Sequence, residues 1–414
     1  MPEQRIVLKN CGIIDPADIS SYIKNGGFDS FSKARYRMKP EEIIGDIKAS
    51  GLSGRGGAGF GCGVKWEFAR KTKANKKYLI CNADEGEVGT FKDRFILMND
   101  PFGLIEGILI AGLAIGADQA YIYLRAEYHY LHDLIANAID QSRQKGFLSH
   151  TDIKIFEGAG AYICGEESAL MNSIEGRRGE SRFKPPFPPQ KGLWSQPTII
   201  NNVETLMNVP HIIKNGAPWF SAIGTAKSKG TKVFSVSGDV RHPGVYELPM
   251  GSGLKELVVD MAGAEDIQAV QIGGAAGNIL PRDNLDVTLS NETYLGAGAV
   301  VVLDGTRSII DVVHNNIRFL HEESCGKCTP CRDGLQAMLE IYDRFMAGEG
   351  QEKDVRVLED LSQVMAMASL CGLGQAAPIP VLDSLKNFKE DYAKLIQQSA
   401  YIRSYTAKGL SITS

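Results

Sequence analysis

Apolar residues follow two different periods between residues 76 and 176. Short apolar runs of strand length are each followed by a segment whose apolar residues recur every three or four positions. In chain order the pattern predicts a strand over 76–84, a helix over 104–115, a strand over 120–126, a helix over 130–142, a strand over 152–158 and a helix over 167–176. Such alternation favours a mainly parallel α/β sheet with helices on both faces, and functional loops at the carboxyl ends of its strands.

The chain before this segment predicts one strand and two helices. The run "RIVLKN" at residues 5–10 has strand character, and Ile43, Ile44 and Ile47 recur at helical spacing within "KPEEIIGDIKASGL". A glycine-rich stretch follows this helix directly. We therefore expect a helical N-terminal region that ends in a glycine loop.

Strict alternation returns after residue 229. A β-hairpin is expected over 232–248, a helix over 253–263, and strands over 267–274 and 298–303, which together make a small α+β domain. Helical spacing then predicts two antiparallel helices, over 335–345 and 357–365. The predicted domains are 1–75, 76–228, 229–307 and 308–414.

Composition restricts the class of protein. The 414 residues carry a formal net charge of -4 and are 43% hydrophobic, as expected for a soluble globular protein without general affinity for nucleic acid. The first ten residues lack an apolar signal core, and the apolar stretch from Gly103 contains Glu106 and is too short to insert in a membrane. We expect a cytoplasmic protein whose eight cysteines include metal ligands.

The stretch "GRGGAGFGCGVKW", residues 54–66, has G-x-G-x-x-G spacing through Gly54, Gly56 and Gly59. In a Rossmann unit this fingerprint follows a strand, whereas here it follows a predicted helix. An ordinary Rossmann site is therefore not indicated. Two interpretations stay open, a loop whose backbone approaches a flat or phosphorylated ligand and a turn between domains.

Two polar loops follow predicted strands. "NADEGEVGTFKDR" comes after the first and "GAGAYICGEESAL" after the third. Their carboxylates and amides suit ribose hydroxyls, a flavin edge or a magnesium ion, although Glu166 and Glu167 also fit the first turn of a helix. Farther on, prolines within 185–189 predict a rigid extended loop, and Asn201 and Asn202 either cap a helix or contact a ligand.

Four cysteines carry the strongest chemical signal. Cys325, Cys328 and Cys331 stand at three-residue steps, and the two predicted helices would return Cys371 to them. Three thiols in one loop with a distant fourth suit a 4Fe–4S cluster. A structural zinc site and a C-x-x-C dithiol are the alternatives. A flavin beside such a cluster is chemically coherent, because a flavin accepts electron pairs and releases single electrons.

The motifs together resemble one known family. "GLSGRGGAGF", "NADEGEVGTFKDR", "GAGAYICGEESAL", "KPPFPPQKGLW", "NNVET", "ESCGKCTPCR" and "CGLG" are similar to segments of the 51 kDa-type NADH-binding flavoprotein subunit of respiratory complex I. They are similar too to its homologues in NAD-linked hydrogenases, formate dehydrogenases and electron-bifurcating complexes. The resemblance covers about residues 40–375 and implies three parts, an FMN-binding α/β domain, a β-grasp (SLBB-like) domain and a helical bundle that holds a 4Fe–4S cluster.

The resemblance also implies cofactors and roles. It implies FMN, a 4Fe–4S cluster on the four cysteines and NAD(H) as the substrate, with a carboxylate that disfavours the 2′-phosphate of NADP(H). Hydride transfer needs no catalytic side chain, and Lys65 and Glu87 are implied positioning residues. The implied cofactor-binding residues are Gly54, Arg55, Gly56, Gly57, Gly59, Phe60, Lys65, Phe68, Asn82, Asp84, Glu85, Glu87, Tyr162, Gly165, Glu166, Glu167, Phe187, Asn201, Asn202 and Thr205. The resemblance implies that the adenine of NADH lies among Phe60, Phe68 and Phe187, and core packing is the alternative for these three phenylalanines.

Departures from the family concern the nicotinamide side. Gly61, Cys62, Gly86 and Val88 replace residues usual in the family, so a relay subunit with a lapsed dinucleotide site is an alternative function. Cys62 is either a redox-sensitive thiol or a small filler. The N-terminal lead resembles the hydrogenase and bifurcating branch of the family. A complex I NADH dehydrogenase subunit is the second alternative function. The implied partners are a thioredoxin-like 2Fe–2S subunit and a further electron-carrying catalytic subunit, such as a hydrogenase or formate dehydrogenase.

Overall fold

Four parallel strands form the first sheet of the computed structural model, which describes residues 3–293 and 295–407. The strands are β1 (Tyr78–Ala83), β2 (Gln119–Leu124), β3 (Asp152–Glu157) and β4 (Thr198–Asn202). Their order is β3-β2-β1-β4, with Ile80 paired to Tyr121 on one side and to Ile200 on the other. The three predicted strands and the parallel sheet are confirmed, whereas β4 was not predicted.

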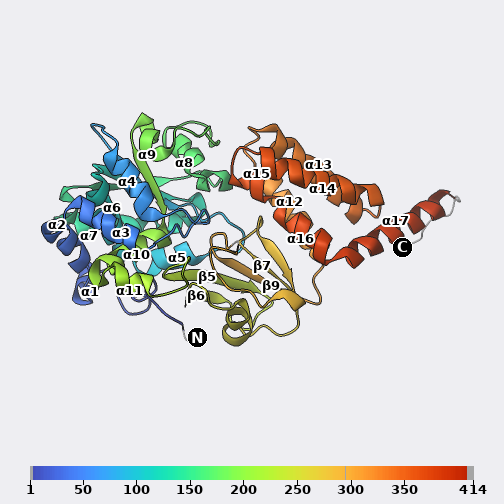
Figure 1. Ribbon diagram of the computed structural model, residues 1–414, viewed down its shortest axis with the longest axis horizontal. Coiled ribbons are helices and arrows are strands. Elements are labelled where there is room, and N and C mark those ends of the chain that lie inside the picture. The colour runs from blue at the N-terminus through green and yellow to red at the C-terminus, as the bar shows by residue number, and fades with distance from the viewer. Residues whose placement is uncertain (1–2, 294, 408–414) are drawn as a thin grey trace.

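Helices cover both faces of this sheet (Figure 1). Alternate residues of a strand point to opposite faces, so Leu79 and Cys81 join the core of one face and Ile80 that of the other. The first face packs on α6 (Pro101–Ile115), which is buried along almost its whole length, and on α10 (Val203–Asn215). The second face packs on α8 (Glu167–Ile174).

Between residue 3 and the glycine loop the chain forms three helices, not two, and no strand. The helices are α1 (Ile19–Lys24), α2 (Asp29–Arg37) and α3 (Pro40–Ala49). The predicted strand over 5–10 is wrong, because the chain bends at Ile6 and residues 7–10 form turns. The backbone N–H groups of Ile6, Val7 and Leu8 donate to the buried carboxylate of Glu247 at 2.8–3.0 Å, so they take no part in a strand ladder.

Shorter elements connect the sheet to its loops. They are α4 (Cys62–Lys71), α5 (Lys92–Asn99), η1 (Ala126–Leu131), α7 (His132–Gln144), η2 (Phe147–Ser149), η3 (Tyr162–Gly165), α9 (Pro188–Lys191), η4 (Leu193–Ser195) and α11 (Ala217–Ser221). The proline segment was predicted as loop throughout, but its last part forms α9, since proline is well tolerated in the first turn of a helix.

The second sheet is mixed and has five strands. They are β5 (Thr231–Gly238), β6 (Gly244–Pro249), β7 (Ile267–Ile272), β8 (Asn278–Pro281) and β9 (Ala299–Asp304), in the order β6-β5-β9-β7-β8. The predicted hairpin is confirmed as β5 and β6. The expected helix over 253–263 is wound as a π-helix, η5 (Glu256–Met261), and the short η6 (Arg282–Asn284) follows β8.

Helices are the only regular elements between residues 308 and 407, and this part of the chain projects from the two sheets (Figure 1). They are α12 (Ile309–Glu322), α13 (Thr329–Met346), α14 (Glu352–Ala368), α15 (Gly372–Ala376), α16 (Ile379–Asn387) and α17 (Lys389–Ala407). The two predicted helices are confirmed as α13 and α14, which pack through Leu335, Met338, Leu358 and Met365. The second helix ends beside the beginning of the first, as the cysteine spacing requires.

Within residues 3–293 and 295–407, no single helix is long and apolar enough to span a membrane. Only α5 and α6 taken together reach that length and apolar composition, and they are separated by a bend of 99°.

The crossing of α6 and α10 yields a stability prediction. A Cβ atom on Gly107 would lie 2.2 Å from the carbonyl oxygen of Leu206. Gly107→Ala should therefore lower the free energy of unfolding by about 2 kcal/mol or more, because the backbone of α10 must move. The matched control is Gly45→Ala on the exposed side of α3, where nothing lies within 4 Å and where about 0.5–1 kcal/mol should be gained. Urea unfolding measures both, and equal stabilities would contradict the prediction.

Candidate functional site

The glycine loop lies between α3 and α4, next to the carboxyl end of β4. It is closed by a hydrogen bond from Gly54 N to Phe60 O at 2.9 Å, and residues 56–60 are exposed. A Cβ on Gly56 would lie 2.9 Å from Cβ of Asn202, so glycine permits the close approach to β4. The loop follows a helix, as expected, and offers its exposed backbone at the sheet edge.

Arg55 and Thr205 hold this loop from inside. The Thr205 hydroxyl accepts a hydrogen bond from Arg55 N at 2.8 Å, and both residues are buried. The Arg55 guanidinium donates to the carbonyl oxygens of Ser53, Lys229 and Thr231. Their side chains support the loop, and the backbone groups of Arg55 are engaged by Thr205 and Lys232, so both residues act as supports of the loop.

Asp84 follows β1 at the same sheet edge. Its backbone N–H donates to Asn82 Oδ1 at 3.0 Å, and Asn82 Nδ2 donates to Gly165 O at 2.9 Å, which joins the loops after β1 and β3. Asp84 Oδ2 is buried and has no hydrogen-bond partner. Burial raises the pKa of Asp84 to about 7, and the Arg125 charge only partly opposes this. An unpartnered buried acceptor at the same sheet edge as an exposed glycine loop fits a flat ligand that donates N–H groups.

Glu85, Asn201 and Asn202 are already engaged by the protein. The Glu85 carboxylate accepts from Asp93 N and Arg94 N at 2.9 Å, so it caps α5, and burial raises its pKa to about 7. Asn201 Oδ1 accepts from Trp66 Nε1 at 2.9 Å. Asn202 Oδ1 accepts from Glu204 N at 3.0 Å, which confirms the predicted helix cap.

A buried ionic cluster that the sequence did not reveal lies below these loops. Lys92 Nζ is 2.7 Å from Asp93 Oδ1, 2.9 Å from Glu204 Oε2 and 3.2 Å from Asn202 Oδ1. Lys232 Nζ donates to Arg55 O at 3.1 Å, and burial lowers its pKa to about 8. The only sequence signal was the polar segment around Lys92, which carries no information about the partners.

Lys65, Glu166 and Glu167 meet on the outer side of the site. Lys65 Nζ is 3.3 Å from Glu167 Oε2 and donates to Ile200 O at 2.8 Å. Lys184, which sequence reasoning missed, bridges Glu166 at 3.0 Å and Glu167 at 2.7 Å. Burial tends to raise the pKa of Glu167, but the charges of Lys65 and Lys184 hold it below its ordinary value.

The three predicted adenine-contacting phenylalanines do not belong to the core. Phe60, Phe68 and Phe187 are 56%, 53% and 51% exposed. Their aromatic surface is therefore available to a ligand, and core packing does not explain them. Cys62, by contrast, is fully buried, and burial raises its pKa to about 12, so it fits the small-filler interpretation rather than the reactive thiol.

Glu87 contacts the second sheet rather than open space. Its carboxylate accepts from Ala275 N at 2.8 Å and from the Tyr162 hydroxyl at 2.6 Å. Burial raises the pKa of Glu87. Tyr162 also donates its backbone N–H to Glu323 at the end of α12, at 2.8 Å, so it ties the three parts of the chain together.

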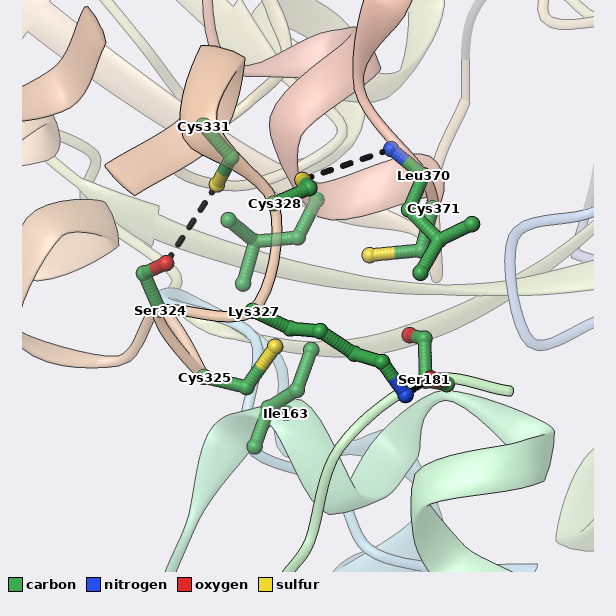
Figure 2. Close-up of a pocket in the computed structure, with 10 residues that line it drawn as sticks. Ile163, Ser181, Ser324, Cys325, Lys327, Cys328, Cys331, Leu370 and Cys371 are labelled. Carbon is green, nitrogen blue, oxygen red and sulfur yellow. Dashed lines mark hydrogen bonds between the residues drawn. The ribbon is translucent and has the colours of Figure 1, made fainter. Parts of the chain in front are cut away.

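Cys325, Cys328, Cys331 and Cys371 line one cavity, and their sulfur atoms point toward a shared space (Figure 2). Two of the thiols have polar partners, Leu370 N at 3.4 Å from Cys328 Sγ and Ser324 Oγ at 3.3 Å from Cys331 Sγ. Within the described part of the chain no three His, Cys, Asp or Glu side chains converge as a single ion requires. Four thiols around a common space fit a polynuclear cluster better than one zinc ion.

The cluster cavity borders the loop that follows β3. Ile163, in η3, lines the cavity from the α/β side, whereas its neighbours Tyr162 and Gly165 face the loops of Glu87 and Asp84. A single 3-10 turn therefore separates the candidate flavin loops from the thiols. This places two candidate cofactor sites side by side.

Two known protein families match the segments of the chain that contain the two sites. The Nuo51 FMN-binding domain matches residues 47–211, and the NADH-ubiquinone oxidoreductase-F iron-sulfur binding region matches residues 311–395. NADP-reducing hydrogenase subunit HndC of Solidesulfovibrio fructosivorans is 44% identical over 94% of this chain and 82% of its own length. An NADH-quinone oxidoreductase subunit of Rhizobium meliloti is 42% identical over 95% of this chain and 98% of its own length. The air-oxidized NAD+-reducing [NiFe]-hydrogenase crystal structure has a TM-score of 0.82, with 40% identity over 89% of this chain and 66% of that one.

Asp84 should make the stability of the ligand-free protein depend on pH. Its pKa is 3.8 ordinarily and about 7 in the fold, so the folded state retains a proton that the unfolded state releases. The proton on Asp84 therefore contributes to the free energy of unfolding. This contribution is fully present below pH 3.8 and is lost as the pH rises through 7. Between pH 5 and pH 8 the wild type should lose about 1–3 kcal/mol of its free energy of unfolding through this group. Asp84→Asn has no carboxyl group at this position and should not show this loss. Urea unfolding at both pH values measures this, and parallel profiles would contradict it.

Proposed function

The chain belongs to the 51 kDa-type family of NADH-oxidising flavoprotein subunits, and we propose which of its residues serve the flavin, the dinucleotide and the cluster. It is an FMN- and 4Fe–4S-containing oxidoreductase subunit of a multisubunit complex, with NAD(H) as the substrate of its family. When bound, FMN exchanges a hydride with the nicotinamide and single electrons with the cluster. The residues bind, orient and electrostatically support these groups.

The carboxyl edge of the first sheet is the proposed flavin site. Gly54, Gly56, Gly57 and Gly59 provide backbone that a planar or phosphorylated ligand can approach, and Asp84 provides the buried acceptor that lacks a partner. Its supporting residues are Arg55, Asn82, Glu85, Gly165, Asn201, Asn202 and Thr205, which hold the loops in place. No side chain acts as a general acid or base, and alignment is the protein's contribution.

The dinucleotide site is proposed on the outer side of the flavin loops. Phe60, Phe68 and Phe187 provide exposed rings for the adenine, and Lys65 supplies positive charge for the pyrophosphate. Glu166 and Glu167 add negative charge that disfavours a 2′-phosphate, and Lys184 partly neutralises it. Glu87 has a positioning role, since its carboxylate connects Tyr162 with the second sheet.

One observation carries the proposed electron route, namely that η3 borders both sites. Ile163 contacts the cavity of the four thiols, and Gly165 lies beside Asp84. Electron transfer between the two groups would therefore cross one turn of backbone. The units we propose are 1–75, 76–228 for the flavin and dinucleotide, 229–307 as an SLBB-like β-grasp domain, and 308–414 for the cluster.

We propose a cytoplasmic complex of the hydrogenase, formate dehydrogenase or bifurcating type, with a thioredoxin-like 2Fe–2S partner and a further catalytic subunit. The 44% identity to an NADP-reducing hydrogenase subunit supports this branch, and the 42% identity to a quinone oxidoreductase subunit supports the complex I alternative. The exposed Phe60, Phe68 and Phe187 favour an active dinucleotide site over a lapsed one.

The proposed function predicts an anaerobic visible spectrum with a flavin band and a broad iron–sulfur shoulder. Added NADH should bleach both, because a hydride pair enters at the flavin and single electrons reach the cluster. NADPH should bleach them more slowly, given the carboxylates near Lys184. A flavin and cluster that only dithionite reduces would instead identify a relay subunit.

The cluster ligands give a separate prediction. A complete cluster contains about four iron atoms per chain. Cys328→Ala should reduce the iron content well below this number, because one iron loses its thiolate. Iron analysis and electron paramagnetic resonance measure the loss. Cys11→Ala is the control, since Cys11 is buried among the N-terminal turns and should leave the iron content unchanged. Full iron in Cys328→Ala would exclude that ligand.

A further inference from the structure

One charged side chain lies in the wall of the cluster cavity. Of the ten described residues that line it, Lys327 alone carries an ammonium or guanidinium group. It stands between the ligands Cys325 and Cys328, and its stem runs along the cavity toward the α/β domain (Figure 2). The remaining lining residues that are not thiols are two serines and three aliphatic side chains.

The position of the Lys327 ammonium is determined by the opposite domain. Its Nζ atom lies 3.0 Å from Glu180 Oε1 and donates to Ser181 O at 2.8 Å. The ring of Phe183 lies beneath it, with its centroid 5.4 Å away. All three groups belong to the short segment after α8, and the Lys327 and Glu180 side chains are only 25% and 31% exposed. The charge is thus held in one place, partly shielded from water.

We propose that Lys327 raises the reduction potential of the cluster and that Glu180 partly offsets this effect. Reduction adds one negative charge to the cluster, and a fixed cation at the cavity wall stabilises that charge, more strongly where water is partly excluded. Glu180 is an anion paired with the same ammonium from the side of the flavin domain. The inference rests on the proposed cluster site and concerns residues that are not ligands.

A purely structural role of the same ion pair would lead to a different result. If Lys327 and Glu180 act only as a clamp between the two domains, removing either partner loosens the same contact and shifts the potential in the same direction. If they act through charge, removing the cation lowers the potential and removing the anion raises it. Opposite signs therefore distinguish electrostatic tuning from a structural role.

The test is a redox titration of the full-length, cluster-loaded chain, followed by electron paramagnetic resonance of the reduced cluster. Lys327→Met should shift the midpoint to a more negative potential, and Glu180→Gln should shift it to a more positive one. Lys327→Arg, which keeps the charge, should remain close to the wild type. Lys394→Met is the matched control, because Lys394 pairs with Asp391 on the exposed side of α17. Its midpoint should not move.

Shifts of the same sign in Lys327→Met and Glu180→Gln, or no shift in either, overturn the inference. If Lys327→Met fails to assemble a cluster, Glu180→Gln decides alone, since only an upward shift supports the role of charge. Iron analysis of the wild type separates this outcome from failure of the proposed function. A wild type without cluster iron overturns both, whereas a wild type with iron and unmoved variants overturns the inference alone.

Discussion

The buried ammonium of Lys92 is the interaction on which the geometry of the flavin side depends. A fully buried cation is tolerated only when it is paired and hydrogen-bonded, and Lys92 meets this condition through Asp93, Glu204 and Asn202. Asp93 belongs to α5, and Asn202 and Glu204 stand where β4 passes into α10. The requirement to neutralise one charge therefore fixes the loops after β1 and β4 relative to each other.

The same constraint extends to the glycine loop and the second sheet. Glu204 also accepts a hydrogen bond from Val233 N at 2.8 Å, and Lys232 donates to Arg55 O. Both Val233 and Lys232 belong to β5, so the mixed sheet supports the glycine loop from below. Pre-organisation of this kind suits hydride transfer, in which the protein aligns two planar groups and supplies no proton of its own.

The second organising feature is the position of η3 between two sites. Tyr162 contacts Glu87 and, through its backbone, Glu323 of the helical bundle, while Ile163 reaches the thiol cavity. Lys327 and Glu180 make a second contact across the same boundary. The helical bundle is thus attached to the α/β domain beside the cavity that the thiols line, which would keep the proposed route for single electrons short.

Local chemistry is what the sequence by itself determined. Periodicity predicted the parallel sheet, the hairpin and the pair α13 and α14, because neighbouring residues decide which face of an element is apolar. Thiol spacing and the polar loops at strand ends predicted the two sites. The tertiary structure alone decided the partners of distant charges. Glu247 binds the N–H groups that a strand over 5–10 would have used, and Lys184 and Lys327 find carboxylates in other elements. Such pairs leave no periodic signal, since burial and proximity select them only after the chain has folded.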